Sequence, residues 1–151
     1  MQQSDDSTTR TADSVAVSRG LYLTMAVSTL LGLAHHVDHI VRGNHVGWPI
    51  TSHVNAFTYS LAIYPLIAVG LALTLSGRAG NRYWAGFFAF STAMLAYLHV
   101  SPWAIEPPGD VILPYADPTL GYLAFTVLLA LIASVCLGSL YAAVAYYRET
   151  A

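Results

Sequence analysis

The sequence has no lysine, only one cysteine and few charged residues of either sign. Charged residues make up 9% of its 151 residues, whereas an ordinary soluble domain carries about 25%. The single cysteine, Cys136, excludes a disulfide framework or a CxxC motif within one chain. The six arginines are scattered and form no basic patch, so nucleic acid is not an expected partner.

Apolar residues are abundant instead, at 56% of the chain, and they gather in four long runs. Each run reaches the roughly 20 residues that a helix needs to cross about 30 Å of hydrocarbon. The expected spans are 19–41, 54–76, 82–103 and 119–147. The runs lack the alternation of strands and are too few to close a barrel. The sequence therefore predicts an all-α, multi-pass protein of the cell membrane, a four-helix antiparallel bundle surrounded by the lipid bilayer.

Residues 1–18 are rich in Ser, Thr and Asp, which predicts a flexible tail ahead of a four-span domain at 19–148.

The arginines predict the orientation, because positive residues favour the cytoplasmic side. One side of the predicted bundle carries Arg10, Arg19, Arg78, Arg82 and Arg148, and the other carries only Arg42. We therefore expect an N-in/C-in topology, with the tail in the cytoplasm.

Two features of the spans concern packing. Small residues recur every four positions in the last span, at Ala130, Ser134, Gly138 and Ala142. Such a stripe lets another helix approach closely, and it serves either this bundle or a homo-oligomer or other membrane partner. Packing within this bundle is the preferred interpretation.

Pro65 lies in the middle of the second span and predicts a kink there.

All histidines fall on the predicted outer side of the membrane. They are His35, His36 and His39 at the end of the first span, His45 and His53 in the first outer connection, and His99 near the end of the third span. Ionisable groups at membrane depth are costly and usually mark a function or a paired network. The histidine layer is therefore the main functional clue. His45 and His53 fit loop, capping or interfacial roles better than ligand roles.

Helical geometry places some of these side chains on one face. At about 100° per residue, His35, Asp38, His39 and Arg42 share a face of the first span, and His36 lies off it. Histidines at i and i+4 can bind one metal ion, as in HExxH helices. The segment here is HHVDH and lacks the glutamate after the first histidine, so a metalloprotease is not expected.

The predicted metal ligands are His35, His39 and His99, with Asp38 as a possible fourth. Asp38 can equally form an i, i+4 ion pair with Arg42. Imidazole ligands suit Zn, Fe or Cu, whereas Mg and Ca prefer oxygen. The expected supporting groups or alternative ligands are His36, Arg42, Asn55, Tyr59 and Thr92.

Haem b is the rival cofactor. His36 or His39 opposite His99 can supply two axial ligands, and Arg42 can bind a propionate. Four ionisable groups within two helical turns suit a compact ion better than a macrocycle.

Three hypotheses for the function follow. The first is a membrane protein whose outer histidine cluster binds a transition metal or haem, with no specific activity assigned. The second is a structural or partner subunit that uses its polar stripe for assembly. The third is a metal-dependent enzyme that acts on a lipid or small molecule, with Asp38 or Glu106 as a base. The sequence assigns no catalytic residue, and a satisfied polar core is the simplest alternative to a metal site.

Overall fold

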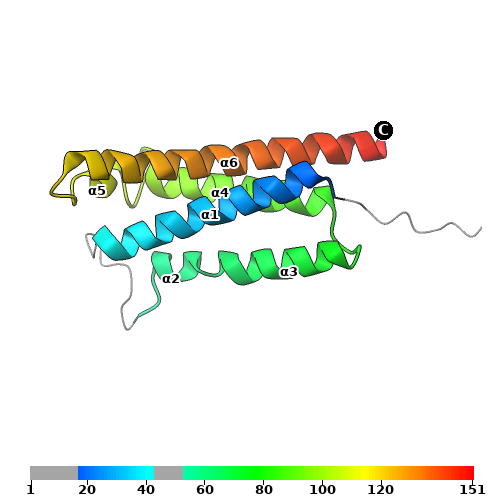
Figure 1. The fold of residues 1–151 in the computed structure, drawn as a ribbon, viewed down its shortest axis with the longest axis horizontal. Coiled ribbons are helices and arrows are strands. Elements are labelled where there is room, and N and C mark those ends of the chain that lie inside the picture. Colours follow the sequence, from blue (N-terminus) through cyan, green and yellow to red (C-terminus); the bar gives the residue numbers. More distant parts are fainter. Residues whose placement is uncertain (1–16, 43–52) are drawn as a thin grey trace, which may run out of the picture.

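The computed structural model describes residues 17–42 and 53–151. Within those residues the chain is 79% helical and has no strand. The helices are α1 (Arg19–Arg42), α2 (Ala56–Ser60), α3 (Ile63–Leu75), α4 (Asn81–His99), α5 (Pro108–Ile112) and α6 (Pro118–Thr150). Figure 1 shows the long helices lying lengthwise beside one another, with α5 tucked against the start of α6. The predicted all-α class is confirmed.

Three of the helical segments are long and apolar enough to cross a membrane. They are α1 with 24 residues, Ala56–Leu75 with 20 residues and α6 with 33 residues. Large apolar side chains cover their outer surfaces, as at Leu30, which is 66% exposed, and Leu137, which is 65% exposed. Outward-facing apolar residues of this kind fit a lipid environment. Of the four predicted spans, the first, second and fourth correspond to these segments.

The third predicted span, 82–103, corresponds to α4, which is not among the segments long and apolar enough to span. This helix has 19 residues and ends at His99, four residues earlier than predicted. Its first turns carry Asn81, Arg82 and Trp84, whose polar groups make that end less apolar. A fourth span at α4 therefore stays a prediction.

The predicted kink at Pro65 corresponds to an interruption between α2 and α3, at Leu61 and Ala62. Proline has no amide hydrogen, and its ring clashes with the carbonyl four residues earlier, which here belongs to Leu61. At the start of α2, Asn55 and Thr58 form a reciprocal capping box. The second span is thus two short helices in series.

The core lies where α1, α4 and α6 meet. It contains Leu21 and Met25 of α1, Trp84 and Phe88 of α4, and Leu131, Val135 and Ala142 of α6. All three helices approach closely at Gly138, where an added Cβ would lie 2.8 Å from Thr24 Cγ2 and 3.1 Å from Phe88 Cδ2. Ser134 adds a hydroxyl contact of 3.0 Å with Ser28. These residues of the predicted small-residue stripe therefore pack within the chain, whereas Ala130 is exposed.

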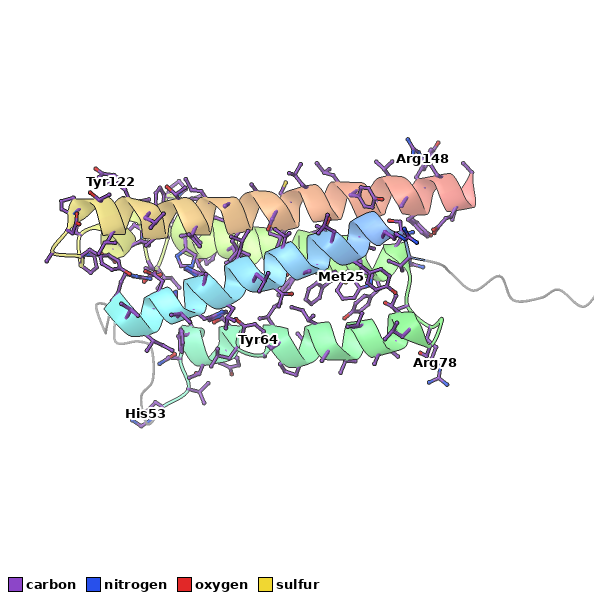
Figure 2. The ribbon with its side chains drawn as sticks, in the orientation of Figure 1. Met25, His53, Tyr64, Arg78, Tyr122 and Arg148 are labelled. Atoms are coloured by element: carbon purple, nitrogen blue, oxygen red, sulfur yellow. The ribbon has the colours of Figure 1, made fainter. Side chains whose placement is uncertain are left out.

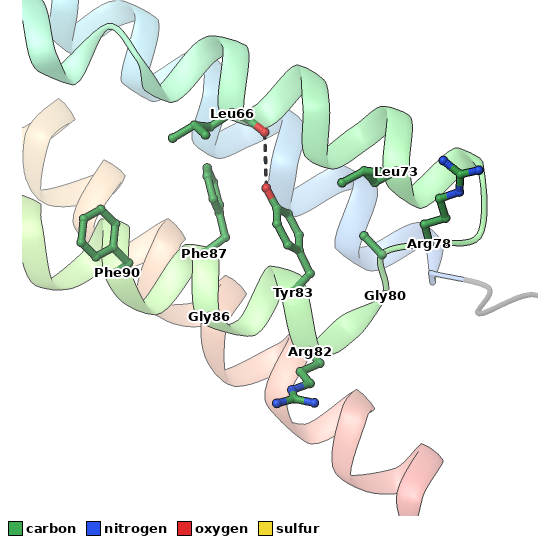
Figure 3. Close-up of a pocket in the computed structure, with 10 residues that line it drawn as sticks. Leu66, Leu73, Arg78, Gly80, Arg82, Tyr83, Gly86, Phe87 and Phe90 are labelled. Carbon is green, nitrogen blue, oxygen red and sulfur yellow. Dashed lines mark hydrogen bonds between the residues drawn. The ribbon is translucent and has the colours of Figure 1, made fainter.

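The two ends of the molecule differ in charge and in shape. Arg78 and Arg148 lie at one end, and His53 and Tyr122 lie at the other (Figure 2). The arginine-bearing end also has a hollow of about 730 Å³ between α3 and α4, where the Tyr83 hydroxyl donates to the Leu66 carbonyl at 3.4 Å (Figure 3). The histidine end holds the cluster described next.

Candidate metal centre

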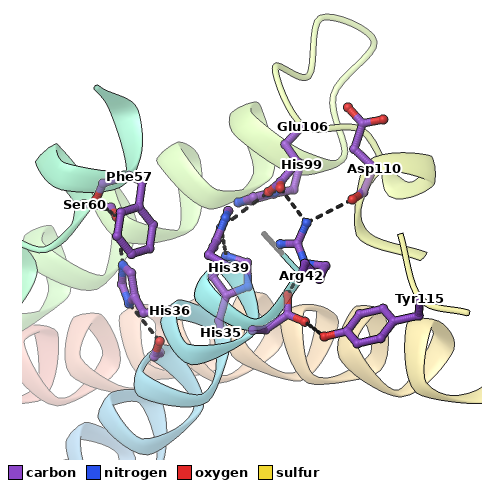
Figure 4. Close-up of polar contacts among 12 residues, drawn as sticks. His35, His36, His39, Arg42, Phe57, Ser60, His99, Glu106, Asp110 and Tyr115 are labelled. Atoms are coloured by element: carbon purple, nitrogen blue, oxygen red, sulfur yellow. Dashed lines mark hydrogen bonds and ion pairs between the residues drawn. The ribbon is translucent and has the colours of Figure 1, made fainter. Parts of the chain in front are cut away.

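The last two turns of α1 bring two imidazoles together. His35 and His39 are both buried, and their Nε2 atoms lie 3.2 Å apart. This confirms the shared face that helical spacing predicts for positions i and i+4. Figure 4 shows both rings directed toward the segment that follows α4.

His99, the last residue of α4, completes a group of three. Its ring centroid lies 4.9 Å from that of His35 and 6.0 Å from that of His39. One ligand atom from each of the three residues lies within 4.8 Å of the others, and all three residues are buried. These three side chains, from two helices far apart in sequence, could hold a metal ion.

A carboxylate that spacing alone does not reveal joins this group. Glu106 is 1% exposed, and its backbone amide donates to the Leu98 carbonyl at 3.0 Å, which holds it beside the end of α4. Its Oε2 lies 3.1 Å from His99 Nδ1 and 3.4 Å from His39 Nε2. Metal–nitrogen bonds of about 2.0 to 2.1 Å place neighbouring ligands of a tetrahedral ion roughly 3.3 Å apart. The spacings around Glu106 and between the two α1 histidines are of that size.

Several polar atoms at this point lack a hydrogen-bond partner among the described residues. They are His35 Nδ1, His99 Nδ1 and Glu106 Oε2, and all are buried. Although His99 Nδ1 and Glu106 Oε2 are close, their geometry is not that of a hydrogen bond. Buried polar atoms are nearly always paired with protein, water or an ion. Two of these atoms, His99 Nδ1 and Glu106 Oε2, lie 3.1 Å apart within the group formed by Glu106 and the histidines.

Arg42 links the charged groups that lie next to the histidines. Its Nε donates to Asp38 Oδ2 at 2.6 Å, and its Nη1 donates to Glu106 Oε1 at 2.7 Å and to the Asp110 carbonyl at 2.9 Å. Asp38 also accepts a hydrogen bond from the Tyr115 hydroxyl. The guanidinium thus joins α1 to the loop that carries Glu106 (Figure 4).

The balance of charge in this cluster is negative. Asp38 and Glu106 share the single guanidinium of Arg42, and the three imidazoles are neutral when they act as ligands. Burial by itself raises the pKa of the Glu106 carboxyl, but the adjacent His99 imidazole and Arg42 guanidinium outweigh it, so the pKa lies below its ordinary value. Glu106 is therefore a carboxylate, with the charge and lone pairs that a metal ligand needs.

His36 points away from this group, as its place on the helix predicts. Its Nε2 lies 2.7 Å from Ser60 Oγ, and its Nδ1 lies 2.8 Å from both the Gly32 carbonyl oxygen and the Tyr64 hydroxyl. Both ring nitrogens are thus engaged with α1 and the α2–α3 segment. His36 can join a metal or haem only if these contacts break.

The structure does not bring the other predicted supporting residues to the cluster. Thr92 donates to the Phe88 carbonyl within α4, and Asn55 caps α2. Tyr59 is 73% exposed, and His53 is exposed as well. Asp38 contacts Arg42 and Tyr115 and is not among the residues whose ligand atoms converge. His45 lies outside the described residues.

The sequence suggests Glu106 as a possible base and does not assign it as one of the ligands. Two sequence features could have indicated a ligand role for Glu106. It is the first acidic residue after His99, and it lies in a short proline-rich segment. Nothing in that spacing shows that the segment turns back over the end of α4.

No protein-family model, no curated protein and no solved structure matches this chain.

Proposed function

We propose that this chain is an integral membrane protein that binds one transition-metal ion through His35, His39 and His99, with Glu106 as the fourth ligand. The observation that carries the proposal is the convergence of three buried imidazoles on one point, next to a carboxylate oxygen that has no hydrogen-bond partner among the described residues.

A bound cation accounts for this cluster better than a merely satisfied polar core. A polar core leaves His99 Nδ1 and Glu106 Oε2 with no close partner except each other at 3.1 Å, in poor hydrogen-bond geometry, and a buried group without a hydrogen bond costs about 1 to 3 kcal/mol. It also leaves two carboxylates to share one guanidinium in a buried layer. A divalent cation at the point of convergence supplies both the missing partner and the missing positive charge.

The donor set favours Zn, Fe or Cu. Three nitrogens and one carboxylate oxygen are the ligands of borderline transition metals, whereas Mg and Ca need mostly oxygen. A compact ion is favoured over haem b, because the Nε2 atoms of His35 and His39 are neighbours 3.2 Å apart. Axial ligands of haem instead lie on opposite faces of the macrocycle.

The membrane arrangement in this proposal has four antiparallel spans, with α4 as the third, and both termini in the cytoplasm. Arg19, Arg78, Arg82 and Arg148 support this orientation, since Arg42 at the histidine end is buried in ion pairs. The metal centre then lies near the outer surface of the cell membrane.

A second candidate function is that of a partner subunit in a membrane complex or a homo-oligomer. Ala130, at the exposed part of the small-residue stripe, favours it. Ser134, Gly138 and Ala142 are used inside the chain, so such an interface has only part of the stripe available.

Metal analysis of the purified protein tests the proposal. We expect about one Zn, Fe or Cu per chain by elemental analysis, without the Soret band of haem. His35→Ala and His99→Ala should each lower the metal affinity by more than about 100-fold, because even groups that only support a ligand cost about 10- to 100-fold. His53→Ala is the matched control and should keep the metal, since His53 is exposed and is not among the histidines whose ligand atoms converge. Equal metal retention in all three variants contradicts the proposal.

Glu106→Gln tests the fourth ligand separately. This substitution keeps the size of the side chain and removes the charge, so we expect the metal affinity to fall about 10- to 100-fold. Competition against a chromogenic chelator gives the affinity. If Glu106→Gln keeps the metal affinity and His99→Ala loses it, Glu106 is not a ligand and only the three histidines bind the metal.

A further inference from the structure

A second cavity begins beside the histidine cluster and runs along the inside of the molecule. Its volume is about 530 Å³, and it lies between α1, the α2–α3 segment, α4 and α6. This volume falls within the roughly 300 to 1,000 Å³ of ligand pockets. Met25 and Tyr64, two of its lining residues, lie between α1 and α3 (Figure 2).

Most of the cavity wall is apolar or aromatic. The lining includes Met25, Ile67, Trp84, Phe87, Phe88 and Leu131. Along α1 it extends from Met25 to His36, eleven residues or roughly 16 Å of helix axis. A long, narrow apolar space of this kind fits an extended hydrocarbon chain.

Three hydrogen-bonding side chains lie together at the end of the cavity nearest the proposed metal centre. Ser28 and Ser91 also line the cavity, but their hydroxyls are paired with Ser134 and the Phe87 carbonyl. His36, Ser60 and Tyr64 line that end, and the His36 ring nitrogens lie 2.7 Å from Ser60 Oγ and 2.8 Å from the Tyr64 hydroxyl. The Ser60 hydroxyl already donates to the Phe57 carbonyl at 2.6 Å. Because a hydroxyl group can accept two hydrogen bonds, Ser60 and Tyr64 keep the capacity to accept one from another partner. His35, a proposed metal ligand, lines the same end of the cavity.

The cavity also opens toward the lipid-facing surface. Leu66, Phe90 and Met94 line it and are 50%, 64% and 41% exposed. No residue of α3 belongs to the core cluster that joins α1, α4 and α6. A molecule dissolved in the bilayer can therefore enter between α3 and α4 without crossing the polar ends.

We infer that this cavity binds a membrane-dissolved amphiphile, a long-chain molecule with one uncharged hydroxyl end. The chain lies against Met25 and Trp84, and the hydroxyl bonds to Ser60 and Tyr64 beside the metal centre. The inference rests on the proposed function, because it takes a metal ion to lie beside the bound ligand. It adds the chemical class of that ligand.

Fluorescence quenching tests the inference with two brominated probes. The protein carries Trp48→Phe and Trp103→Phe, so that Trp84 is the only tryptophan, and it is held in nanodiscs of palmitoyl-oleoyl phosphatidylcholine. ω-Bromododecanol should quench Trp84 saturably, because its bromine reaches the far end of the cavity when its hydroxyl is bound. Bromododecane, which lacks the hydroxyl, is the matched probe and should bind more weakly.

Two variants separate the polar end from the apolar space. Ser60→Ala with Tyr64→Phe should weaken the binding of the alcohol about tenfold and leave bromododecane unchanged, because it removes only hydrogen bonds. Gly32→Leu should abolish saturable quenching by either probe. An added Cβ at Gly32 meets only Leu131 Cδ1, at 4.0 Å, so the larger side chain grows into the cavity and not into the backbone.

Metal content is measured on the same samples to keep the two proposals apart. If the metal is present but both probes quench equally, or neither reaches saturation, the cavity holds ordinary lipid and the ligand inference is wrong. If the alcohol binds saturably and selectively but the protein holds no metal, the proposed function is wrong and the cavity assignment stands.

Discussion

Arg42 connects the charges of the histidine cluster. Its side chain is 1% exposed and bridges the carboxylates of Asp38 and Glu106. Buried ion pairs contribute little net stability, but removal of one partner leaves an uncompensated charge in the interior. Arg42 therefore compensates the negative charges of the two buried carboxylates next to the proposed metal ligands.

Arg42→Met should lower the free energy of unfolding by about 3 to 5 kcal/mol, because both carboxylates lose their counter-charge. Unfolding in mixed detergent micelles, followed by circular dichroism, measures the loss. The matched control is Arg78→Met, since Arg78 is exposed at the opposite end of the molecule. If the two variants unfold alike, the bridging role of Arg42 is contradicted.

The titration of the Tyr115 phenol at high pH reports on the same network of charged groups. Burial and the hydrogen bond to Asp38 raise the pKa of the Tyr115 phenol to about 12, above the ordinary value near 10. The folded protein thus holds this proton more tightly than the unfolded chain does. Its contribution to stability is complete below about pH 10 and is lost as the pH rises through 12.

The absorbance of tyrosinate near 295 nm measures this titration. The difference between the wild-type protein and Tyr115→Phe should show one phenol that titrates near pH 12. A midpoint near 10 would mean that Tyr115 is not bonded to Asp38.

Residue types and helical spacing were enough to identify the three histidines that could hold a metal ion. They placed His35 and His39 on one face of α1, and they identified His99 as the third histidine. They did not assign Glu106 as a ligand, because its position depends on a turn after α4 that the spacing does not encode. They left Asp38 as either a ligand or an ion-pair partner, and the structure has it paired with Arg42.

At the scale of elements, the loop that carries Glu106 depends on how α5 meets α6. Gly121 lies in the first turn of α6, where an added Cβ would come 2.2 Å from the backbone oxygen of Ile112. Backbone atoms cannot move aside as a flexible side chain can. A glycine is therefore required for α5 to pack against α6 at this distance.

Gly121→Ala should displace α5 and lower the free energy of unfolding by about 1 to 3 kcal/mol, as overpacking does. It should also weaken metal binding, because the loop containing Glu106 moves with α5. Gly86→Ala is the matched control, since nothing lies within 4 Å of the added Cβ and alanine favours the helix. Thermal unfolding and metal titration of both variants measure the two effects. Equal behaviour of the two contradicts the packing argument.

Sequence patterns predicted the four long helical segments, but not the short helix α5, the division into α2 and α3, or the exact limits. The four apolar runs correspond to α1, the α2–α3 segment, α4 and α6, and the interruption before Pro65 agrees with the loss of one backbone donor. The predicted end of the third run at Trp103 was too late. Apolar composition continues beyond His99, but the backbone turns there so that Glu106 can bond to Leu98.

For the whole molecule, the topology can be tested with single cysteines in a Cys136→Ser background. Trp103→Cys should react with a membrane-impermeant maleimide on intact cells, because Trp103 is 74% exposed at the histidine end. Thr150→Cys should react only after permeabilisation, since it lies at the arginine-bearing end. The opposite pattern would reverse the proposed orientation.

The longest helix supplies no proposed metal ligand, yet it contacts α1, α4 and α5. These are the two helices that carry the histidines and the short helix that follows Glu106. Any tilt of α6 would shift these neighbours together and change the distances between ligand atoms. At about 50 Å, α6 exceeds the thickness of the hydrocarbon, and its tilt depends on how thick the surrounding lipid is. We therefore expect the geometry of the proposed metal centre to depend on bilayer thickness.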